Sequence, residues 1–341
     1  FEDYNELFSR VKLDLGGAGF PSKTTDQLMD GYRDGSNTEA ESRYLEFLYY
    51  QYGRYLLMGS SQEGSLPANL QGIWAEGLNP PWAADYHTNI NVQMNYWPAQ
   101  QTNLAECHQP MIDYTMSLVP RGTETAKFFH QTQDGQDVRG WTTYHENNIW
   151  GYAVPAISGA FYCPTAAAWL SQDLWEQYAF TMDQTVLEQN FDTMLGAALF
   201  WVDFLWEDER DGYLVANPSY SPEHGPLTLG ASSEQQVIWQ NFEDVIKAAE
   251  ILGKGDMPEI AEIREAQSRL WLPRIGENGQ YMEWKDETTL DITGDGGHRH
   301  VNHLFGLHPG NLIVAGRSDV DDQYVEAMKV TLNTRGDGGT G

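Results

Sequence analysis

The sequence predicts an all-α domain whose chemistry lies in the loops between its helices. Apolar residues recur at helical spacing along much of the chain, and no convincing alternating run predicts a sheet. Long loops separate the helical runs at 59–88, 135–160, 212–232 and 286–298. Loops of this length in a compact domain are usually functional. Paired helices of such lengths suit a ring of α-hairpins.

The helical pattern is clearest in the segments 38–58, 111–118, 166–180, 185–206, 233–252 and 320–332. The first of these is apolar nearly all round, so we expect it to be buried. Pro110 suits the first turn of the second segment, and Gly253 suits the end of the fifth. The pieces 212–215 and 279–283 are at most short hairpin strands.

The domain organisation follows from these runs. Residues 1–37 are polar and interrupted by glycines, so we expect a linker that enters a helical body at 38–341. The chain begins at Phe1 and stops at Gly341 in a glycine-rich turn, so we expect both ends to be cut. The predicted helices are too few for a closed ring of six hairpins, and further residues are expected to complete it.

The charge of the chain excludes some classes of partner. The 341 residues include 49 acidic and 20 basic side chains, for a net charge of −29, whereas nucleic acids and anionic membranes require a basic surface. No run of about 18 apolar residues predicts a membrane span. Strong acidity fits a secreted or periplasmic protein. Aromatic residues make up 13%, which suits either sugar stacking or an aromatic core. The pairing of Cys107 and Cys163 cannot be read from sequence.

The loop Asn217–Gly225 holds the first candidate catalytic residue. Pro218 and Pro222 favour extended backbone on either side of Ser219–Ser221, and Glu223 is the only residue of the loop with a fixed charge. A carboxyl in a rigid, weakly charged loop is a candidate general acid. A solvated loop glutamate explains the same residue about equally well.

A second candidate site is the segment that contains His87, Asn89 and Asn91. If the segment is extended, these three side chains share one face, and the asparagines can hold a water or a sugar hydroxyl. The alternative is a polar helix start, with Asn91 as its cap. Trp82, shortly before the segment, is a candidate for stacking on a sugar ring.

Three further loops carry polar candidates. His298, His300 and His303 have the spacing of metal ligands, but Arg299 among them disfavours a cation, so we predict hydroxyl binding by Arg299 and His300. A purely structural histidine cluster is the alternative. Glu146 lies in an aromatic loop, and Asp337 lies in a glycine-rich turn. No glycine motif for phosphate or dinucleotide binding is present, and no cofactor or metal is predicted.

Taken together, these loops resemble the inverting α-L-fucosidases of glycoside hydrolase family 95. The matching stretches run in family order and cover nearly the whole chain past residue 40: Leu66–Trp74, Asp85–Trp97, Asn217–Gly225, Gly297–Gly310 and Arg335–Gly341. The resemblance implies an (α/α)6 toroid of the six-hairpin glycosidase type, here truncated at its C-terminus. It also implies flanking β-domains that are absent from this chain.

The resemblance assigns a role to each candidate. Glu223 takes the position of the general acid, Asn89 and Asn91 hold the attacking water, and Asp337 makes that water basic. The other positions imply contacts to the sugar hydroxyls or methyl group, made by His87, Glu146, Arg299, His300 and the aromatic Trp82. The arrangement suits inversion, which needs an acid on one face of the sugar and room for water on the other.

The implied substrate is a terminal α-L-fucosyl group, expected to be α-1,2-linked in oligosaccharides or polysaccharide side chains. The alternatives are an α-L-galactosidase on the same scaffold, a glycoside phosphorylase, and a catalytically silent sugar-binding protein. His87 favours fucose, since threonine at this position resembles the galactosidase pattern. A phosphorylase needs a basic phosphate site, and only Arg299 and Arg335 lie nearby. The chain departs from the family pattern at 144–148, at 62–63, and at Trp239 and Asn241, which leaves the aglycone preference open. The oligomeric state is not predicted.

Overall fold

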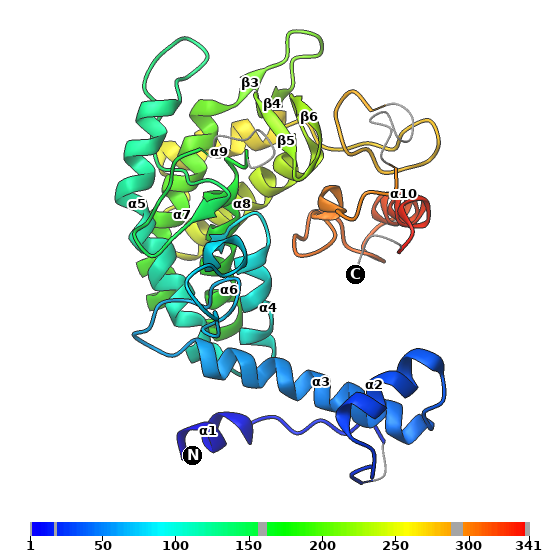
Figure 1. The fold of residues 1–341 in the computed structure, drawn as a ribbon. Helices are drawn as coiled ribbons and strands as arrows, with labels where there is room; N and C mark the ends of the chain where they lie inside the picture. The colour runs from blue at the N-terminus through cyan, green and yellow to red at the C-terminus, as the bar shows by residue number, and fades with distance from the viewer. Residues whose placement is uncertain (1, 17–18, 156–161, 288–295, 338–341) are drawn as a thin grey trace. The chain divides into compact units, whose positions relative to one another are not determined.

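The computed structural model describes residues 2–16, 19–155, 162–287 and 296–337. Helices dominate, as the sequence predicts (Figure 1). The α-helices are α1 (Glu2–Phe8), α2 (Thr25–Asp34), α3 (Glu39–Ser60), α4 (Asn91–Gln101), α5 (Gln109–Phe129), α6 (Ala166–Thr181), α7 (Gln184–Phe204), α8 (Ser232–Ile251), α9 (Pro258–Arg269) and α10 (Asp319–Arg335). Among the described residues, no helix is both long and apolar enough to cross a membrane.

The strands of the described residues form short antiparallel pairs. β1 (Tyr86–His87) pairs with β2 (Glu146–Asn147), and β3 (Trp206–Glu207) pairs with β4 (Leu214–Val215). β5 (Ser219–Ser221) pairs with β6 (His224–Thr228). β4 confirms the hairpin piece expected at 212–215. The segment 279–283 forms only an isolated bridge, in which Tyr281 opposes Ile275.

The chain divides into two compact units. The first consists of residues 1–84 and 94–113, and the second of residues 85–93 and 114–341. In the first unit, α1 and α2 pack against α3. The buried Arg54 of α3 donates hydrogen bonds to the carbonyl oxygens of Leu7 at 2.9 Å and Phe8 at 3.1 Å, and so caps the last turn of α1.

The structure corrects two expectations for this unit. The segment 1–37 is not simply a linker, because α1 and α2 lie within it. The short polar helix α2 escapes sequence analysis because its only buried side chain is Leu28. The second correction concerns α3, which is not buried all round: Tyr49 and Tyr52 are 81% and 54% exposed. Tyrosine tolerates exposure because its ring ends in a hydroxyl group.

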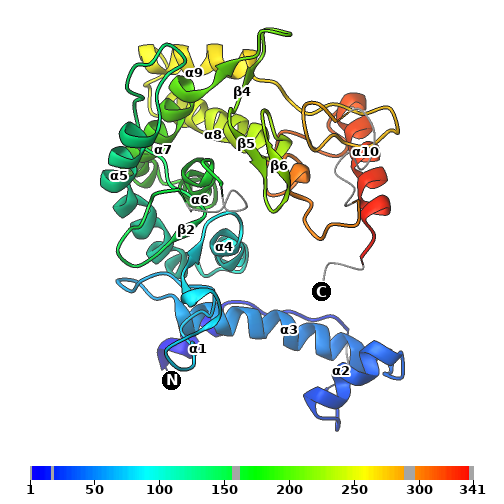
Figure 2. The same cartoon turned by 45° about the horizontal axis from the view of Figure 1, so that its top comes forward.

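The second unit contains the main helical core. α6 packs against α7 and α8, and α9 covers α8 (Figure 1 and Figure 2). Phe200 and Trp201 of α7 are fully buried, and the indole of Trp141 donates to the carbonyl of Thr193 at 2.8 Å. This bond fastens the loop before β2 to α7. A smaller cluster joins α10 to residues 281 and 301–313 through Tyr281, Leu304, Ile313, Ala327 and Met328.

The strongly apolar helices confirm the predictions to within a few residues, and α5 is longer than expected. Gly253 follows α8 with a φ of +68°, the left-handed conformation that suits glycine at a helix end. α9 is not predicted, and the sequence indicates α4 only through the alternative of a helix start at Asn91. Pro98 interrupts the apolar pattern of α4. The buried face of α9 is a narrow stripe that consists of Ile260, Ile263 and Ala266.

Candidate active site

The acid loop forms the hairpin β5–β6, which contacts the first turns of α8 (Figure 2). Ser221 opposes His224 across the turn, and this places Glu223 at its tip. The buried Ser219 fixes the base of the hairpin, since its hydroxyl accepts a hydrogen bond from the amide of Ala231 at 2.9 Å. The expectation that this segment is not helical is confirmed.

Glu223 contacts two residues of the loop at 298–303. Arg299 Nη2 donates to Glu223 Oε2 at 2.5 Å, and His300 Nε2 lies 3.9 Å from the same oxygen. The His300 ring also lies against the hairpin backbone, with Nδ1 2.9 Å from the carbonyl oxygen of Pro222. The Glu223 side chain is 27% exposed, so it is held in place but accessible. The structure thus brings together three of the predicted site residues.

A second group forms where β1 pairs with β2. The register places His87 opposite Glu146, so their side chains are on the same face of the ladder. The buried Asn147 secures this arrangement, because its amide donates to the carbonyl of Tyr144 at 2.7 Å and to the hydroxyl of Thr88 at 3.3 Å. His87 is held from the other side by a short contact between its Nδ1 and Asp85 Oδ1.

The asparagine segment is not one extended strand. β1 ends at His87, residues 88–90 form a turn, and α4 begins at Asn91, so the extended-face expectation is wrong and the helix-start alternative is closer. The side chain of Gln93 stabilises the turn, because it donates a hydrogen bond to the carbonyl of Thr88 at 2.7 Å. Asn89 is buried, and within the described residues its Oδ1 has no hydrogen-bond partner. A buried acceptor of this kind suits a water molecule or a sugar hydroxyl.

His145 connects the two groups, and sequence analysis misses it. Its ring centroid lies 4.4 Å from that of His87, and it also interacts electrostatically with His300. Burial, together with the charges of these two histidines, lowers the pKa of His145 to about 3. His145 is therefore neutral at physiological pH. The one signal in the sequence is its position directly before Glu146.

Behind the hairpin lies a buried cluster of charged and polar groups around Glu283. Burial opposes ionisation, but His303, His224, Arg335 and Ser221 outweigh it and lower the pKa of Glu283 to about 2. Burial lowers the pKa of His303 itself to about 4. A cavity of about 20 Å³ beside the cluster has room for a single water molecule. The sequence indicates Glu283 only as part of a short strand, because a glutamate between Met282 and Trp284 fits the alternation of an ordinary half-exposed strand.

A second buried carboxyl, Glu234, lies at the start of α8. Ser219 donates to its Oε2 at 2.5 Å, and within the described residues its Oε1 has no partner. Burial raises the pKa of Glu234 to about 8. It is therefore mostly protonated at neutral pH, in contrast to Glu283.

Two further predicted residues are Asp337 and Trp82. Asp337 is exposed and lies two residues after the end of α10. Trp82 is 71% exposed and belongs to the first compact unit.

The histidines of the 298–303 loop do not form a metal cluster. His298 stacks on His224 with ring centroids 4.5 Å apart, and His303 is buried against Glu283. Among the residues described, no group of three or more His, Cys, Asp or Glu side chains could hold a metal ion.

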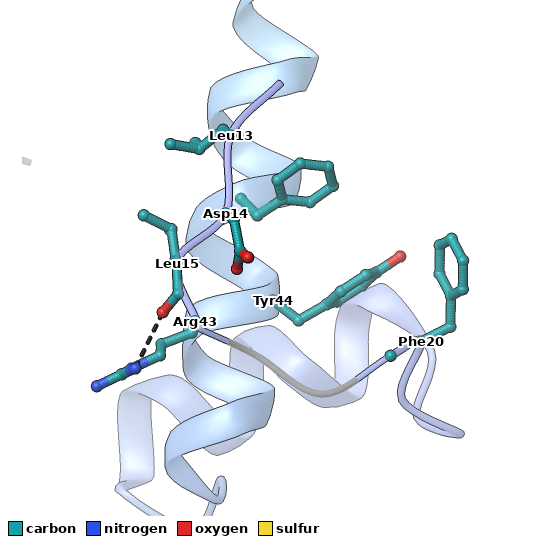
Figure 3. Close-up of a pocket in the computed structure, with 8 residues that line it drawn as sticks. Leu13, Asp14, Leu15, Phe20, Arg43 and Tyr44 are labelled. Atoms are coloured by element: carbon teal, nitrogen blue, oxygen red, sulfur yellow. Dashed lines mark hydrogen bonds between the residues drawn. The ribbon is translucent and has the colours of Figure 1, made fainter. Parts of the chain in front are cut away.

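The first unit has a separate pocket of about 200 Å³ (Figure 3). It lies between residues 13–15 and 19–20 on one side and α3 on the other, and Arg43 Nη1 donates to the carbonyl of Leu15 beside it at 3.0 Å. None of the predicted site residues lines this pocket, which consists of Leu13, Asp14, Leu15, Gly19, Phe20, Arg43, Tyr44 and Phe47. The candidate active site is therefore the face of the second unit that carries Glu223.

The domain is built mainly of helices, and polar residues gather in the loops that connect them. A solved structure, a putative kojibiose phosphorylase from human microbiome, aligns with 89% of this chain and 43% of its own at a TM-score of 0.51, and the likeness shows the (α/α)6 fold at 9% sequence identity. The model of the glycosyl hydrolase family 95 catalytic domain matches residues 1–341. The chain belongs to this family.

Curated relatives agree with the family match. "Alpha-L-fucosidase 2" of Arabidopsis thaliana is 36% identical over 99% of this chain. "Probable alpha-fucosidase A" of Aspergillus niger is also 36% identical, and the protein of the same name from Aspergillus oryzae is 31% identical. The chain spans about two fifths of the length of these relatives: 40%, 42% and 38% respectively.

Proposed function

We propose that the full-length protein is an inverting exo-α-L-fucosidase that removes terminal fucose, with a preference for α-1,2 linkages. The observation that carries the proposal is the position of Glu223 at the tip of the β5–β6 hairpin, in contact with Arg299 and His300. Support also comes from the family and from the printed names of the relatives, which are α-fucosidases.

In the proposed mechanism, Glu223 is the general acid. It gives its proton to the glycosidic oxygen as the bond from that oxygen to the anomeric carbon breaks. Arg299 donates to Oε2 of the same carboxyl, so this oxygen already has a hydrogen-bond partner before substrate binds. We therefore expect the guanidinium to move to the sugar hydroxyls when substrate binds, which leaves Glu223 free to carry the proton.

Water attacks the anomeric carbon from the opposite face. Asn89 suits the task of holding this water, because its buried Oδ1 has no partner within the described residues. An amide is too weak a base to accept the proton of the water, so a carboxylate is required. We assign that role to Asp337, acting with Asn91, from their positions in the family motifs.

His87 and Glu146 are the proposed sugar contacts beside the acid. Their opposed positions on β1 and β2 present one carboxylate and one ring on the same face. Glu146 can accept hydrogen bonds from sugar hydroxyls, whereas the ring of His87, fixed by Asp85, offers an apolar surface to the fucose methyl group.

The test compares leaving groups. Glu223→Ala should lower turnover of 2′-fucosyllactose by about 10²- to 10⁴-fold, the usual contribution of a general acid. The loss on 4-nitrophenyl α-L-fucoside should be much smaller, because nitrophenolate leaves without a proton. Glu277→Ala, at an exposed loop glutamate, is the control and should change neither rate. Equal losses on both substrates in Glu223→Ala would exclude Glu223 as the acid.

A further inference from the structure

The acid loop converges on a buried carboxylate that belongs to none of the family motifs identified in the sequence. This carboxylate is Glu283, which lies between Met282 and Trp284 and has a side chain that is only 3% exposed. Within the described residues its hydrogen bonds go to the neighbours of Glu223 and not to Glu223 itself, so any effect on the acid must pass through other residues.

Glu283 holds the chain on both sides of Glu223. Ser221, two residues before the acid, donates its hydroxyl to Glu283 Oε1 at 2.6 Å. His224, the residue after the acid, places Nδ1 3.3 Å from each oxygen of the same carboxylate. One side chain thus fixes the two ends of the short turn that carries Glu223.

The opposite side of Glu283 is anchored to α10. Arg335, the last residue of α10, makes a short contact with Oε2 and also donates to the carbonyl of His298 at 3.3 Å. His298 directly precedes Arg299, the partner of Glu223. The pair Glu283–Arg335 therefore joins the acid hairpin to the loop that supplies the contacts of the acid.

We infer that Glu283 is a positioning residue that sets the place of the Glu223 carboxyl through Ser221 and His224. This inference rests on the proposed function, in which Glu223 is the general acid. Proton transfer requires the acid to lie within hydrogen-bond reach of the glycosidic oxygen, so a small displacement of the hairpin tip is costly. A buried carboxylate with a cationic partner is well suited to fix such a tip, because neither charge can reach water elsewhere.

The first test is kinetic and uses the full-length protein. Glu283→Gln keeps the shape of the side chain but leaves Arg335 without a charged partner. We expect kcat on 2′-fucosyllactose to fall by about 10- to 100-fold, less than the full contribution of the acid, and kcat on 4-nitrophenyl α-L-fucoside to change by less than about 3-fold. In a Glu223→Ala background the same substitution should have almost no further effect on 2′-fucosyllactose. An equal loss on both substrates, or an additive loss in the double variant, would overturn the inference.

A matched control separates positioning from loss of stability. Asp208 forms another buried ion pair with Lys285, which lies two residues after Glu283. Lys285 Nζ is 2.6 Å from Asp208 Oδ2, and both side chains are 6% exposed. Asp208→Asn should destabilise the protein in a similar way, but it should lower the kcat values on the two substrates by the same factor. Ser221→Ala, which removes one contact and no charge, should shift the ratio of the two rates in the same direction as Glu283→Gln, by a smaller factor.

The second test needs no substrate. Hydrogen exchange of the peptides that cover 217–228 should become faster in Glu283→Gln than in the unaltered protein, and should stay unchanged in Asp208→Asn. Unchanged exchange in Glu283→Gln would overturn the inference. If the unaltered protein cleaves neither fucoside, the proposed function fails, and the exchange measurement alone decides whether Glu283 positions the hairpin.

Discussion

Two buried carboxyls beside the acid hairpin have opposite ionisation. Glu283 contacts Arg335, and the side chains around it lower its pKa despite burial. Glu234 accepts a hydrogen bond from the hydroxyl of Ser219 and has no cationic partner among the described residues, and burial raises its pKa to about 8. The same hairpin is therefore held by an anion on one side and by a neutral acid on the other, and the two should respond differently to pH.

We predict that Glu234→Gln stabilises the protein at pH 7. The pKa of Glu234 is raised in the folded state to about 8, against roughly 4.3 in an unfolded chain. The folded state therefore holds the proton more tightly, and stability is lost as pH rises from about 4.3 toward 8. At pH 7 this loss is roughly 3 kcal/mol, and the neutral glutamine avoids it.

Thermal unfolding of the two proteins at pH 4 and pH 7 checks this prediction. The variant should be more stable at pH 7 and nearly equal to the unaltered protein at pH 4. Glu265→Gln, at an exposed position of α9, controls for the loss of one negative charge. A gain of the same size at both pH values would contradict the assigned ionisation.

At the scale of elements, the loop that carries Glu146 depends on a close backbone approach. Gly140 has a φ of +68°, and a Cβ atom at this position would lie 1.9 Å from the carbonyl oxygen of Gly196 in α7. Gly196 itself leaves room for the ring of Trp141, since a Cβ there would lie 2.9 Å from Trp141 Cδ1. Two glycines thus allow the loop before β2 to lie directly on α7.

Gly140→Ala should therefore destabilise the protein far more than Gly135→Ala. Gly135 also has a positive φ of +82°, but a Cβ there would meet nothing within 4 Å, so its cost should be the left-handed strain alone, about 1 kcal/mol. Gly140→Ala adds a backbone clash, and we expect at least about 3 kcal/mol. Chemical unfolding of both variants measures the difference. Equal costs would mean that the loop does not lie on α7 as described.

The sequence predicts those elements that its apolar pattern defines. The apolar pattern locates α3, α6, α7, α8 and α10 closely. It does not reveal α9, whose apolar stripe is narrow, and it indicates α4 only through the alternative of a helix start at Asn91, because Pro98 hides the helical period. The sequence leaves the segment 88–90 open between an extended strand and a helix start, because a turn stabilised by the Gln93 side chain has no signature in a single sequence.

The candidate site was predictable where a motif was rigid. The prolines around Glu223 indicated a non-helical loop, and the structure places Arg299 and His300 beside it. Glu283 and His145 were not predicted, because their roles depend on contacts between segments far apart in the chain, such as Glu283 with Arg335.

At the scale of the whole molecule, the second unit presents the acid hairpin, the β1–β2 pair and the 298–303 loop together. The proposed function assigns to them an acid, sugar contacts and a buried amide acceptor. These parts suit an inverting hydrolysis, in which a proton is delivered on one side of the sugar and water attacks on the other. The central claim is therefore stereochemical.

Proton NMR of the full-length protein hydrolysing 2′-fucosyllactose tests this claim most directly. The anomeric signal of the first sugar released reports its configuration before mutarotation mixes the two forms. We predict that β-L-fucose appears first, because a single displacement by water inverts the α-linked substrate. Initial appearance of α-L-fucose would contradict the proposed mechanism.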